Sequence, residues 1–394
     1  MQQGKFNILL DAMWGSSGKG KVSAWLADKF CVNNVSSSNF PNAGHTFQSE
    51  NYKFVAKTLP TALALKQAKA LNIMGWLSPA SGITITDSEH WERLITEWIQ
   101  TGKPNVAIHS RASMVTPGHA EMEKTGPGST KHIASTMQGC SAAMVDKILR
   151  KESVLLAGSR SVEEWTGTEV DLEEFASCVR ILDGAHFRSS VQQLIRQGNT
   201  WLHEGSQGYA LSIDHGSSYP HCTSRNCTAQ KAMDDMAIPA KDVGDVYLNL
   251  RTHPIRVGNV EENGIQLGYS GDFYSDCKEM SWKQVAEEAG MPSSEVQALV
   301  ERERTTVTKR IRRVCSFSWE GLEDAVASNG ATKLALNFVQ YIDWNDRGLR
   351  GEKKAFDKLS PKTRAFIDKI EQVANLPVVL IGTGADHEAM ISLL

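Results

Sequence analysis

The stretch Trp14-Gly15-Ser16-Ser17-Gly18-Lys19-Gly20-Lys21 lies between two segments with different hydrophobic patterns, and it decides the predicted fold. Before it, residues 6–10 form a short apolar run that stops at Asp11, which indicates a buried strand. After it, residues 22–30 carry apolar side chains at helical spacing. A strand, a glycine-rich loop and a helix in this order can hold a phosphate group at the helix N-terminus.

The loop itself has the composition of an anion site. Its glycines let main-chain amides turn toward an anion, and Lys19 and Lys21 add positive charge. The loop matches the GxxxxGK part of a Walker A motif, but Val22 stands where that motif has Ser or Thr. We therefore expect a P-loop-like site outside the standard Walker family. An ordinary glycine turn with solvated lysines is the plainer alternative.

Strands and helices alternate along the remaining chain. Candidate strands cover residues 52–59, 106–109, 200–205, 333–340 and 378–381. Candidate helices cover residues 88–100, 171–187, 191–197, 282–289 and 294–304. Polar loops are predicted at 33–46, 116–141 and 211–229, and a helix or a pair of strands at 243–256. This alternation predicts an α/β fold with a large, mainly parallel central sheet flanked by helices. No repeat or linker divides residues 1–394, so we expect a single domain.

Composition excludes several classes of protein. Lys plus Arg number 42 and Asp plus Glu number 45, and the net charge of −3 argues against a protein that coats a nucleic acid polymer. No apolar stretch approaches the ~20 residues of a membrane helix, and the first residues do not resemble a secretory signal. The seven cysteines are scattered, which favours reduced thiols over a zinc site. We expect a cytoplasmic protein that does not bind membranes.

Three further clusters are candidates for chemistry. Residues 42–46 read NAGHT, and a His between small residues in a polar loop suits an acid or a phosphate ligand. Residues 204–208 read EGSQG after a predicted strand, where a Gln can both donate to and accept from a purine edge. Residues 305–313 combine three hydroxyl groups with four cations, which suits a loop over an anionic substrate. A core histidine, a structural turn and a solvated surface run are the respective plainer alternatives.

These clusters, in this order, resemble the adenylosuccinate synthetase family, whose members carry WGDEGKGK, NAGHT, EGAQG and an arginine-rich TTGRRRR-type loop. Here the segments read WGSSGKGK, NAGHT, EGSQG and TVTKRIRR. Residues 213–216 (IDHG), 256–258 (RVG) and 382–386 (GTGAD) also match, so the resemblance spans nearly the whole chain. It implies a carbon–nitrogen ligase. In the family reaction the γ-phosphate of a nucleoside triphosphate moves onto the oxygen at purine position 6, and the amino group of L-aspartate then displaces it.

The resemblance also implies roles for individual residues. The catalytic set is Ser16, Lys19, His45 as general acid, and Gln207 at the purine edge. The triphosphate-binding set is Ser17, Gly18, Lys19, Gly20, Lys21, Gly44, His45, Thr46, Arg312, Asn337, Gln340, Gly382 and Gly384. The set that binds the purine monophosphate is Ser16, Asn42, Ser135, Thr136, Arg150, Gln207, Thr223, Val257 and Gly258. The aspartate-binding set is Thr306, Thr308, Arg310 and Arg312. The family further implies Mg²⁺ near Ser16 and Gly44, and a homodimer in which Arg150 reaches the neighbouring subunit's monophosphate.

Three departures from the family pattern bear on the substrates. Ser16 replaces the Asp that is the family's catalytic base and magnesium ligand, which opens space beside purine position 2. A guanine amino group would fit there, as in the bacteriophage members that ligate aspartate to dGMP. The group that removes the ring nitrogen-1 proton is then open: Ser16 through a water, or the substrate's own phosphate. Residues 337–340 read NFVQ where the family has TKLD, which favours ATP or dATP over GTP as donor, unless guanine is read elsewhere. Residues 116–141 lack the family's GRGIGP run, which is consistent with a deoxyribose.

Three rival interpretations stay open at this level. An ordinary adenylosuccinate synthetase acting on IMP with GTP would retain the carboxylate that Ser16 replaces. A P-loop nucleotide kinase would have no use for Arg310 and Arg312. A non-catalytic nucleotide-binding protein would explain Ser16, but not the retention of His45 and of both arginines.

Overall fold

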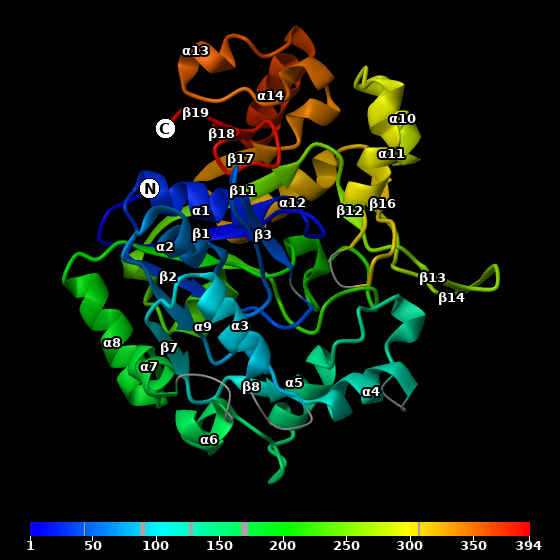
Figure 1. Cartoon of the computed structure of the whole chain (residues 1–394). Helices are drawn as coiled ribbons and strands as arrows, with labels where there is room; N and C mark the ends of the chain where they lie inside the picture. Colours follow the sequence, from blue (N-terminus) through cyan, green and yellow to red (C-terminus); the bar gives the residue numbers. More distant parts are fainter. Residues whose placement is uncertain (43, 87–90, 126–128, 167–171, 306–307) are drawn as a thin grey trace.

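A ten-stranded sheet runs through the centre of the computed structural model (Figure 1). The structure describes residues 1–42, 44–86, 91–125, 129–166, 172–305 and 308–394. From edge to edge the strands are β19 (Met390–Ser392), β18 (Val378–Gly382), β17 (Lys333–Asn337), β11 (Val243–Arg251), β1 (Phe6–Asp11), β10 (Trp201–Glu204), β2 (Asn34–Ser37), β5 (Met74–Leu77), β7 (Val106–His109) and β9 (Val179–Leu182). Neighbouring strands run parallel, except for the antiparallel pair of β18 and β19. The predicted fold class is confirmed.

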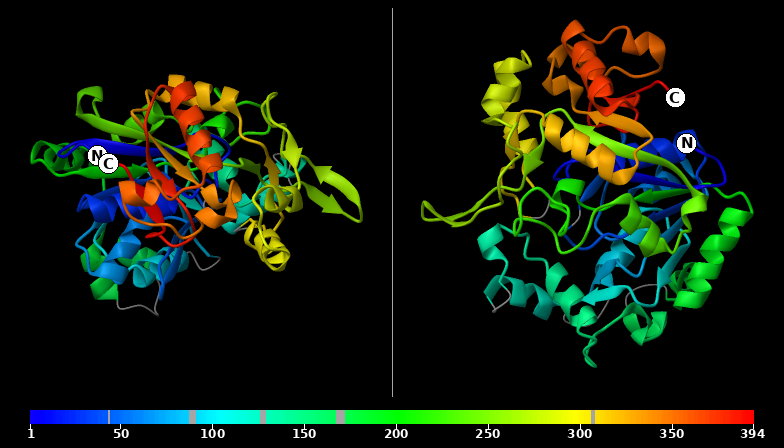
Figure 2. Two further views of the ribbon diagram at one scale, coloured as in Figure 1. Left: turned by 90° about the horizontal axis from the view of Figure 1, so that it is seen from above. Right: turned by 180° about the vertical axis from the view of Figure 1, so that it is seen from behind.

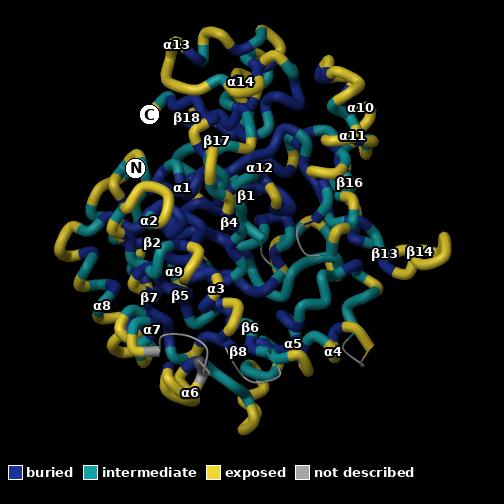
Figure 3. The backbone as a smooth tube through the Cα atoms, viewed as in Figure 1, coloured by how far each residue is buried: buried dark blue, intermediate teal, exposed yellow. Residues whose placement is uncertain are grey.

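Alternation along β1 shows how the sheet is covered on both faces. Leu9 packs into one apolar cluster, while Phe6, Ile8 and Leu10 pack into another, as the two-residue period of a strand requires. The Leu9 cluster includes side chains of α1 (Lys19–Lys29), α2 (Ala64–Lys69), α3 (Glu92–Gln100) and α7 (Leu172–Cys178). The other includes side chains of α8 (Gly184–Arg196), α9 (Ala229–Met236), α12 (Trp319–Asn329) and α14 (Pro361–Ala374). The central strands are accordingly the most deeply buried part of the chain (Figure 3).

Smaller elements surround this core. The remaining helices are α4 (Pro117–Thr125), α5 (Cys140–Ile148), α6 (Val162–Thr166), α10 (Trp282–Glu288), α11 (Ser293–Arg302) and α13 (Lys353–Phe356). The minor sheets pair β3 (His45–Gln48) with β4 (Lys53–Ala56), β6 (Gly82–Thr84) with β8 (Ser113–Val115), β13 (Val260–Glu262) with β14 (Ile265–Gly268), and β12 (Ile255–Arg256) and β15 (Glu279–Met280) with β16 (Arg313–Cys315). The β13–β14 hairpin projects from the body of the molecule in every view (Figures 1 and 2).

The prediction of a loop over residues 33–46 was wrong, because β2 lies there near the middle of the main sheet. The polar residues of β2 resemble a loop in sequence, but the strand is fully buried and its side chains form hydrogen bonds inside the core. Trp76 Nε1 donates to Asn34 Oδ1 at 3.1 Å, and Ser36 Oγ lies 3.0 Å from His203 Nδ1. Buried polar groups with partners cost little, so a polar sequence can still form a central strand.

Two other predictions need correction. The helix predicted at 171–187 is interrupted by the edge strand β9, which pairs only with β7 among the described strands. The loop predicted at 116–141 contains α4, whose buried Glu123 accepts hydrogen bonds from the main-chain N–H groups of Gly139 (2.8 Å) and Ser141 (2.7 Å). This carboxylate ties α4 to the start of α5. The segment at 243–256 is a strand pair, β11 and β12, as one of its two predicted forms had it.

Candidate active site

The candidate residues gather where the central parallel strands end. Asp11, Glu204, Arg251, Asn337 and Gly382 are the last residues of β1, β10, β11, β17 and β18. In α/β sheets the crevice outside the carboxyl ends of the strands is the usual place for a ligand. Two of the sequence clusters lie directly at these ends, the glycine-rich loop after β1 and the EGSQG turn at the end of β10.

Residues 12–18, called the phosphate loop below, connect β1 to α1 through a backbone that favours glycine. Gly15 and Gly18 have φ values of 89° and 87°, and Ser16 also lies in the left-handed region at 52°. Helix α1 begins at Lys19 with no acidic residue in its first turn, so its free N–H groups can face an anion. A Cβ at Gly20 would lie 3.0 Å from the main-chain nitrogen of Thr46. The glycine thus lets α1 pack against β3, which carries His45.

Asp11 organises this loop from inside. Its Oδ1 accepts hydrogen bonds from the N–H groups of Met13 (2.8 Å) and Gly15 (3.1 Å). Its Oδ2 accepts from the Ser17 hydroxyl and lies 3.4 Å from Lys19 Nζ. The sequence had suggested only that Asp11 ends a strand. An acidic residue at the carboxyl end of a buried strand, directly before a glycine loop, is the signal that was available.

Three predicted residues of the loop have distinct surroundings. Ser16 is exposed, and its carbonyl accepts a hydrogen bond from Arg251 Nη1 at 2.9 Å. Lys19 is buried, and its Nζ donates to the Gln207 carbonyl at 2.7 Å. Lys21 Nζ donates to the carbonyls of Gly384 (2.7 Å) and Ala389 (2.9 Å), and burial lowers its pKa to about 7. Lys21 thereby joins the first turn of α1 to the C-terminal segment.

His45 stands beside a buried carboxylate that the sequence analysis had not singled out. Its Nδ1 lies 2.5 Å from Oε1 of Glu204, which is 1% exposed. Thr61 donates to the same carboxylate from its main chain (3.0 Å) and its hydroxyl (2.8 Å). Burial pushes the pKa of Glu204 upward, but the charge of His45 and these hydrogen bonds outweigh it and hold the pKa below its usual value. A carboxylate on one ring nitrogen fixes the orientation of a histidine, so the other nitrogen is available to a ligand.

The EGSQG turn lies against the phosphate loop. A Cβ at Gly208 would lie 2.3 Å from the Met13 carbonyl, so only glycine allows this approach. Gln207 itself has a φ of 59° and is half-buried. The turn therefore brings two residues of the predicted catalytic set, Gln207 and Lys19, next to each other and to Asp11.

The two arginines predicted to bind aspartate in residues 305–313, called the arginine loop below, make different contacts. Arg310 donates to Thr308 Oγ1 (3.0 Å), to the Gly258 carbonyl (2.9 Å) and to the Ser135 carbonyl (2.9 Å). It thus ties together segments predicted to bind aspartate and the monophosphate. Arg312 instead faces the carboxylate of Glu303, with Nη1 3.3 Å from Oε2. Thr306 lies outside the described residues.

The segment predicted to read the donor base borders the phosphate loop. Asn337 Nδ2 donates to Asn249 Oδ1 at 2.8 Å, and a Cβ at Gly382 would lie 1.9 Å from Asn337 Oδ1. Gln340 is 7% exposed, and its Oε1 has no partner among the described residues. Phe338, between the two amides, has a φ of 67°, which is unusual for a bulky residue and often marks a functional position.

The other monophosphate candidates are less closely joined. Asn42, Thr136, Thr223 and Val257 are half-buried loop residues. Arg150 is exposed beyond α5, and its side chain makes no hydrogen bond or ion pair with another described residue. The structure of one chain therefore brings Ser135 and Gly258 together but leaves Arg150 apart.

The sequence analysis predicts magnesium near Ser16 and Gly44. The described part of the chain has no cluster of three or more His, Cys, Asp or Glu side chains suited to a metal. Magnesium, however, commonly takes one or two carboxylates together with substrate phosphates and waters. Ser16 is exposed at this position, while the Asp11 carboxylate and the Ser17 hydroxyl beneath it are already bonded to each other.

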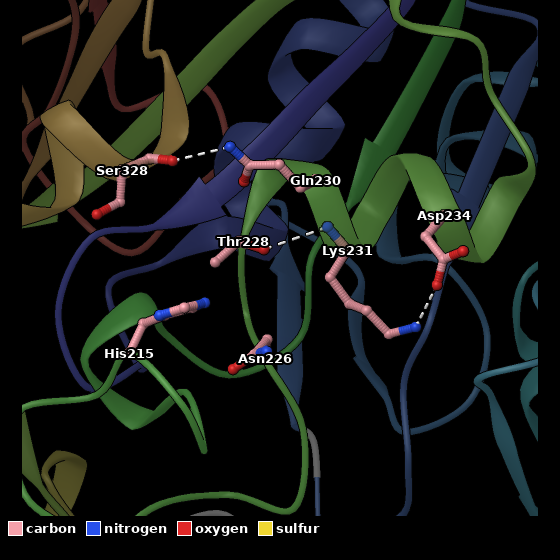
Figure 4. A pocket seen from close by; sticks show the side chains of 7 residues that line it. All are labelled: His215, Asn226, Thr228, Gln230, Lys231, Asp234 and Ser328. Atoms are coloured by element: carbon pink, nitrogen blue, oxygen red, sulfur yellow. Dashed lines mark hydrogen bonds and ion pairs between the residues drawn. The ribbon is translucent and has the colours of Figure 1, made fainter.

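A separate hollow of about 440 Å³ lies at the start of α9 (Figure 4). His215, Asn226 and Lys231 line it, and Lys231 is already paired with Asp234 at 2.6 Å. None of its lining residues belongs to the phosphate, histidine or arginine clusters.

Among the described helices, none is both long and apolar enough to cross a membrane.

Comparisons with known proteins agree with this geometry. The adenylosuccinate synthetase family model matches residues 8–164 and 160–347. An N6-succino-2-amino-2'-deoxyadenylate synthase of Vibrio phage phiVC8 is 30% identical over 345 residues, covering 86% of this chain and 88% of the relative. The adenylosuccinate synthetase of Methanocaldococcus jannaschii is 28% identical over 387 residues, covering 98% and 96%. The solved succinoaminodeoxyadenylate synthetase of cyanophage S-2L, bound to dGMP and to dATP as energy donor, superposes with a TM-score of 0.77 at 26% identity and covers 99% and 96%. With most of its length matched by the family model and a 30% identical relative, this chain belongs to the adenylosuccinate synthetase family.

Proposed function

We propose that this chain joins L-aspartate to dGMP at purine position 6, with ATP or dATP as phosphate donor, to give 2-amino-2'-deoxyadenylosuccinate. The observation that carries the choice of dGMP is Ser16, an exposed hydroxyl residue where an acidic side chain would crowd a 2-amino group. Similarity to the phage synthases supports the same choice. The reaction uses small soluble nucleotides, and we place it in the cytoplasm.

The first step transfers the γ-phosphoryl group to the purine oxygen. The bond between the γ-phosphorus and the bridging oxygen breaks, and the nucleoside diphosphate leaves with its electron pair. A bond from the γ-phosphorus to the position-6 oxygen forms, and the ring nitrogen-1 proton passes to the substrate's own phosphate or to a water held by Ser16. Lys19 and the N-terminus of α1 stabilise the charge that develops on the phosphate oxygens. His45, oriented by Glu204, acts as general acid beside the transferred group.

The second step forms the carbon–nitrogen bond. The aspartate amine attacks carbon 6 and loses one proton, and inorganic phosphate leaves with the electron pair of the broken carbon–oxygen bond and takes up that proton. Gln207 holds the purine edge, while Arg312 and Thr308 hold the aspartate carboxylates. Guanidinium groups suit this task because they recognise carboxylates through paired hydrogen bonds.

Magnesium belongs to the proposal as the partner of the triphosphate. Ser16 and the main chain of Gly44 are the residues that would hold it. When bound, it neutralises phosphate charge and so makes the γ-phosphoryl group easier to transfer.

The second candidate is an ordinary adenylosuccinate synthetase that uses IMP and GTP. The similarity to the Methanocaldococcus enzyme over nearly the whole chain favours it. Two residues argue against this second candidate: Ser16 in the phosphate loop, and the neutral Gln340 in residues 337–340, called the donor segment because they are predicted to contact the donor base. Neither residue supplies the carboxylate that those substrates meet in that branch of the family.

One assay separates these functions. The protein is incubated with Mg²⁺, L-aspartate, and either ATP with dGMP or GTP with IMP, and products are resolved by chromatography. We expect a succinylated product from dGMP and little from IMP. Conversion of IMP alone would establish the second candidate, and phosphate release without aspartate dependence would indicate a kinase.

We also infer a homodimer. Arg150 extends from the end of α5 next to Ile148 and Leu149, which are 68% and 62% exposed. Large apolar side chains exposed together are typical of an interaction surface. A second copy covering this end of α5 would give Arg150 the monophosphate partner that its own chain does not provide.

A further inference from the structure

Glu303 is a carboxylate enclosed by two arginines at the end of α11. It is 3% exposed, and its Oε1 lies 2.6 Å from Arg251 Nη2 while its Oε2 lies 3.3 Å from Arg312 Nη1. The Tyr341 hydroxyl also donates to Oε1, at 3.0 Å. A buried charge costs several kcal/mol unless it is paired. Two guanidinium groups around one carboxylate leave a net positive charge in the interior, which favours an anionic ligand.

Arg251 connects this cluster to the phosphate loop and to the donor segment. Its Nη1 donates to the Ser16 carbonyl at 2.9 Å. Its guanidinium also lies 4.0 Å from the centre of the Phe338 ring, and that ring borders Gly18. The arginine is 2% exposed, so its orientation is fixed by these contacts rather than by solvent.

Arg312 carries the donor that a substrate could use. Its Nε is buried and has no hydrogen-bond partner among the described residues. A buried N–H group of a charged side chain without an acceptor is costly, so this group calls for an acceptor that the described residues do not supply. Glu303 occupies only one corner of the Arg312 guanidinium, so a second carboxylate can be received at Nε.

We propose that Glu303 is a positioning residue that aims Arg312 at a carboxylate of aspartate and ties that arginine, through Arg251, to the loop at Ser16. The proposal rests on the proposed function in taking aspartate as the second substrate. Glu303 itself touches no substrate and acts only through Arg312.

The first test is Glu303→Gln, which keeps the shape of the side chain but removes its charge and one acceptor. The KM for aspartate should rise roughly 10- to 100-fold, while the KM values for dGMP and ATP should stay within about threefold. Glu279→Gln is the matched control, because Glu279 pairs with the neighbouring Arg313 at 2.7 Å on the exposed side of the same loop. That variant should leave the KM for aspartate within about twofold.

A double-mutant cycle gives the sharper test. If Glu303 acts through Arg312, then Arg312→Lys and Glu303→Gln should not add: the double variant should resemble Arg312→Lys alone in its KM for aspartate. Fully additive effects, or equal rises in all three KM values for Glu303→Gln, would overturn the proposal. Should Glu303→Gln fold poorly, Glu303→Asp, which keeps the charge, should still raise chiefly the aspartate KM. An unchanged value there would also overturn it.

These outcomes are separable from the proposed function. If the wild-type enzyme accepts IMP rather than dGMP, the choice of purine is wrong, yet the comparison of aspartate KM values can be made with IMP. The role of Glu303 then stands or falls on its own data.

Discussion

Asp11 shows how much one buried side chain can do for a loop that lost an acidic residue. Position 16 carries no carboxylate, but Asp11 holds the main chain at Met13 and Gly15, the Ser17 hydroxyl and the Lys19 ammonium from beneath. A carboxylate with four donors is a rigid anchor. It therefore fixes the geometry of the loop from beneath and leaves position 16 free of a carboxylate.

Asp11→Asn should weaken binding of the donor triphosphate. The Asn side chain has only one acceptor oxygen. Its NH2 group would replace the other oxygen and would face N–H or O–H groups that are themselves donors. Loss of hydrogen bonds to a charged acceptor costs about 1.5–3 kcal/mol, which corresponds to roughly 10- to 100-fold in ATP affinity. Calorimetric titration with ATP measures this. Asp28→Asn is the control, because Asp28 pairs with Lys69 at 2.6 Å near the far end of α1, and this variant should bind ATP nearly as well as wild type. Equal affinity of Asp11→Asn and wild type would contradict the anchoring role.

His45→Ala should remove turnover with modest loss of binding. A general acid contributes about 10²- to 10⁴-fold in rate, so kcat should fall by that factor while the KM values change little. Glu204→Gln should give a smaller fall in kcat, because it leaves the imidazole in place but removes the charge at its Nδ1. Steady-state kinetics with saturating substrates decides the order. A larger loss in Glu204→Gln than in His45→Ala would refute this division of roles.

At the scale of elements, α3 is bound to the segment after β4 by Glu97, whose carboxylate accepts from the N–H groups of Lys57 (2.9 Å) and Leu59 (2.9 Å). Burial raises the pKa of Glu97 to about 7 from an ordinary 4.5, although these hydrogen bonds oppose the rise. The folded protein therefore holds this proton more tightly than the unfolded chain does between those two values.

The consequence for stability has a definite sign. The stabilisation from protonated Glu97 is complete below pH 4.5 and is lost as the pH rises to about 7. Over this window the loss of the Glu97 proton should lower the free energy of unfolding by up to about 1.4 kcal/mol for each unit that the pH rises. Denaturant unfolding of wild type and Glu97→Gln across this range measures the difference. The variant should lack this component, and identical pH profiles would contradict the assignment.

Elements with a clear apolar pattern could be predicted from the sequence, and those built on buried polar contacts could not. Residues 6–10 and 22–30 match β1 and α1 because their apolar residues follow the period of a strand and of a helix. Strand β2 was missed because Asn34, Ser36 and Ser37 read as loop, although their burial depends on partners distant in the chain. Helix α4 was missed for the same reason, since Glu123 finds its partners only in the fold.

The same division holds for the site. Motif residues such as Lys19, His45 and Arg312 were identifiable from their order along the chain. The structure places them near the carboxyl ends of the central strands. Asp11 and Glu303 were not identified, because their importance lies in what they contact rather than in a motif. Glu204 lies in the EGSQG motif, but its pairing with His45 could be seen only in the fold. The ligand assignments of the motif residues remain predictions.

At the scale of the whole molecule, the proposed dimer predicts a loss of assembly from a single surface change. Ile148→Glu places a charge among exposed apolar side chains at the end of α5 and should shift the protein toward a monomer. Activity should fall with it, since Arg150 would lose the neighbouring subunit's monophosphate. Light scattering after size-exclusion chromatography gives the mass. Ile265→Glu on the β13–β14 hairpin, where Ile265 is similarly exposed at 64%, should leave the mass unchanged. A monomeric but fully active wild type would contradict the proposal.

The central claim is that Ser16 makes room for the amino group of guanine. Its most direct test is the ratio of kcat/KM for dGMP to that for IMP, measured with ATP and aspartate for wild type, Ser16→Ala and Ser16→Asp. We expect wild type and Ser16→Ala to prefer dGMP, and Ser16→Asp to lose at least about tenfold of that preference, since a clash or an unpaired polar group commonly costs 1–3 kcal/mol. An unchanged preference in Ser16→Asp, or a wild type that prefers IMP, would contradict the account.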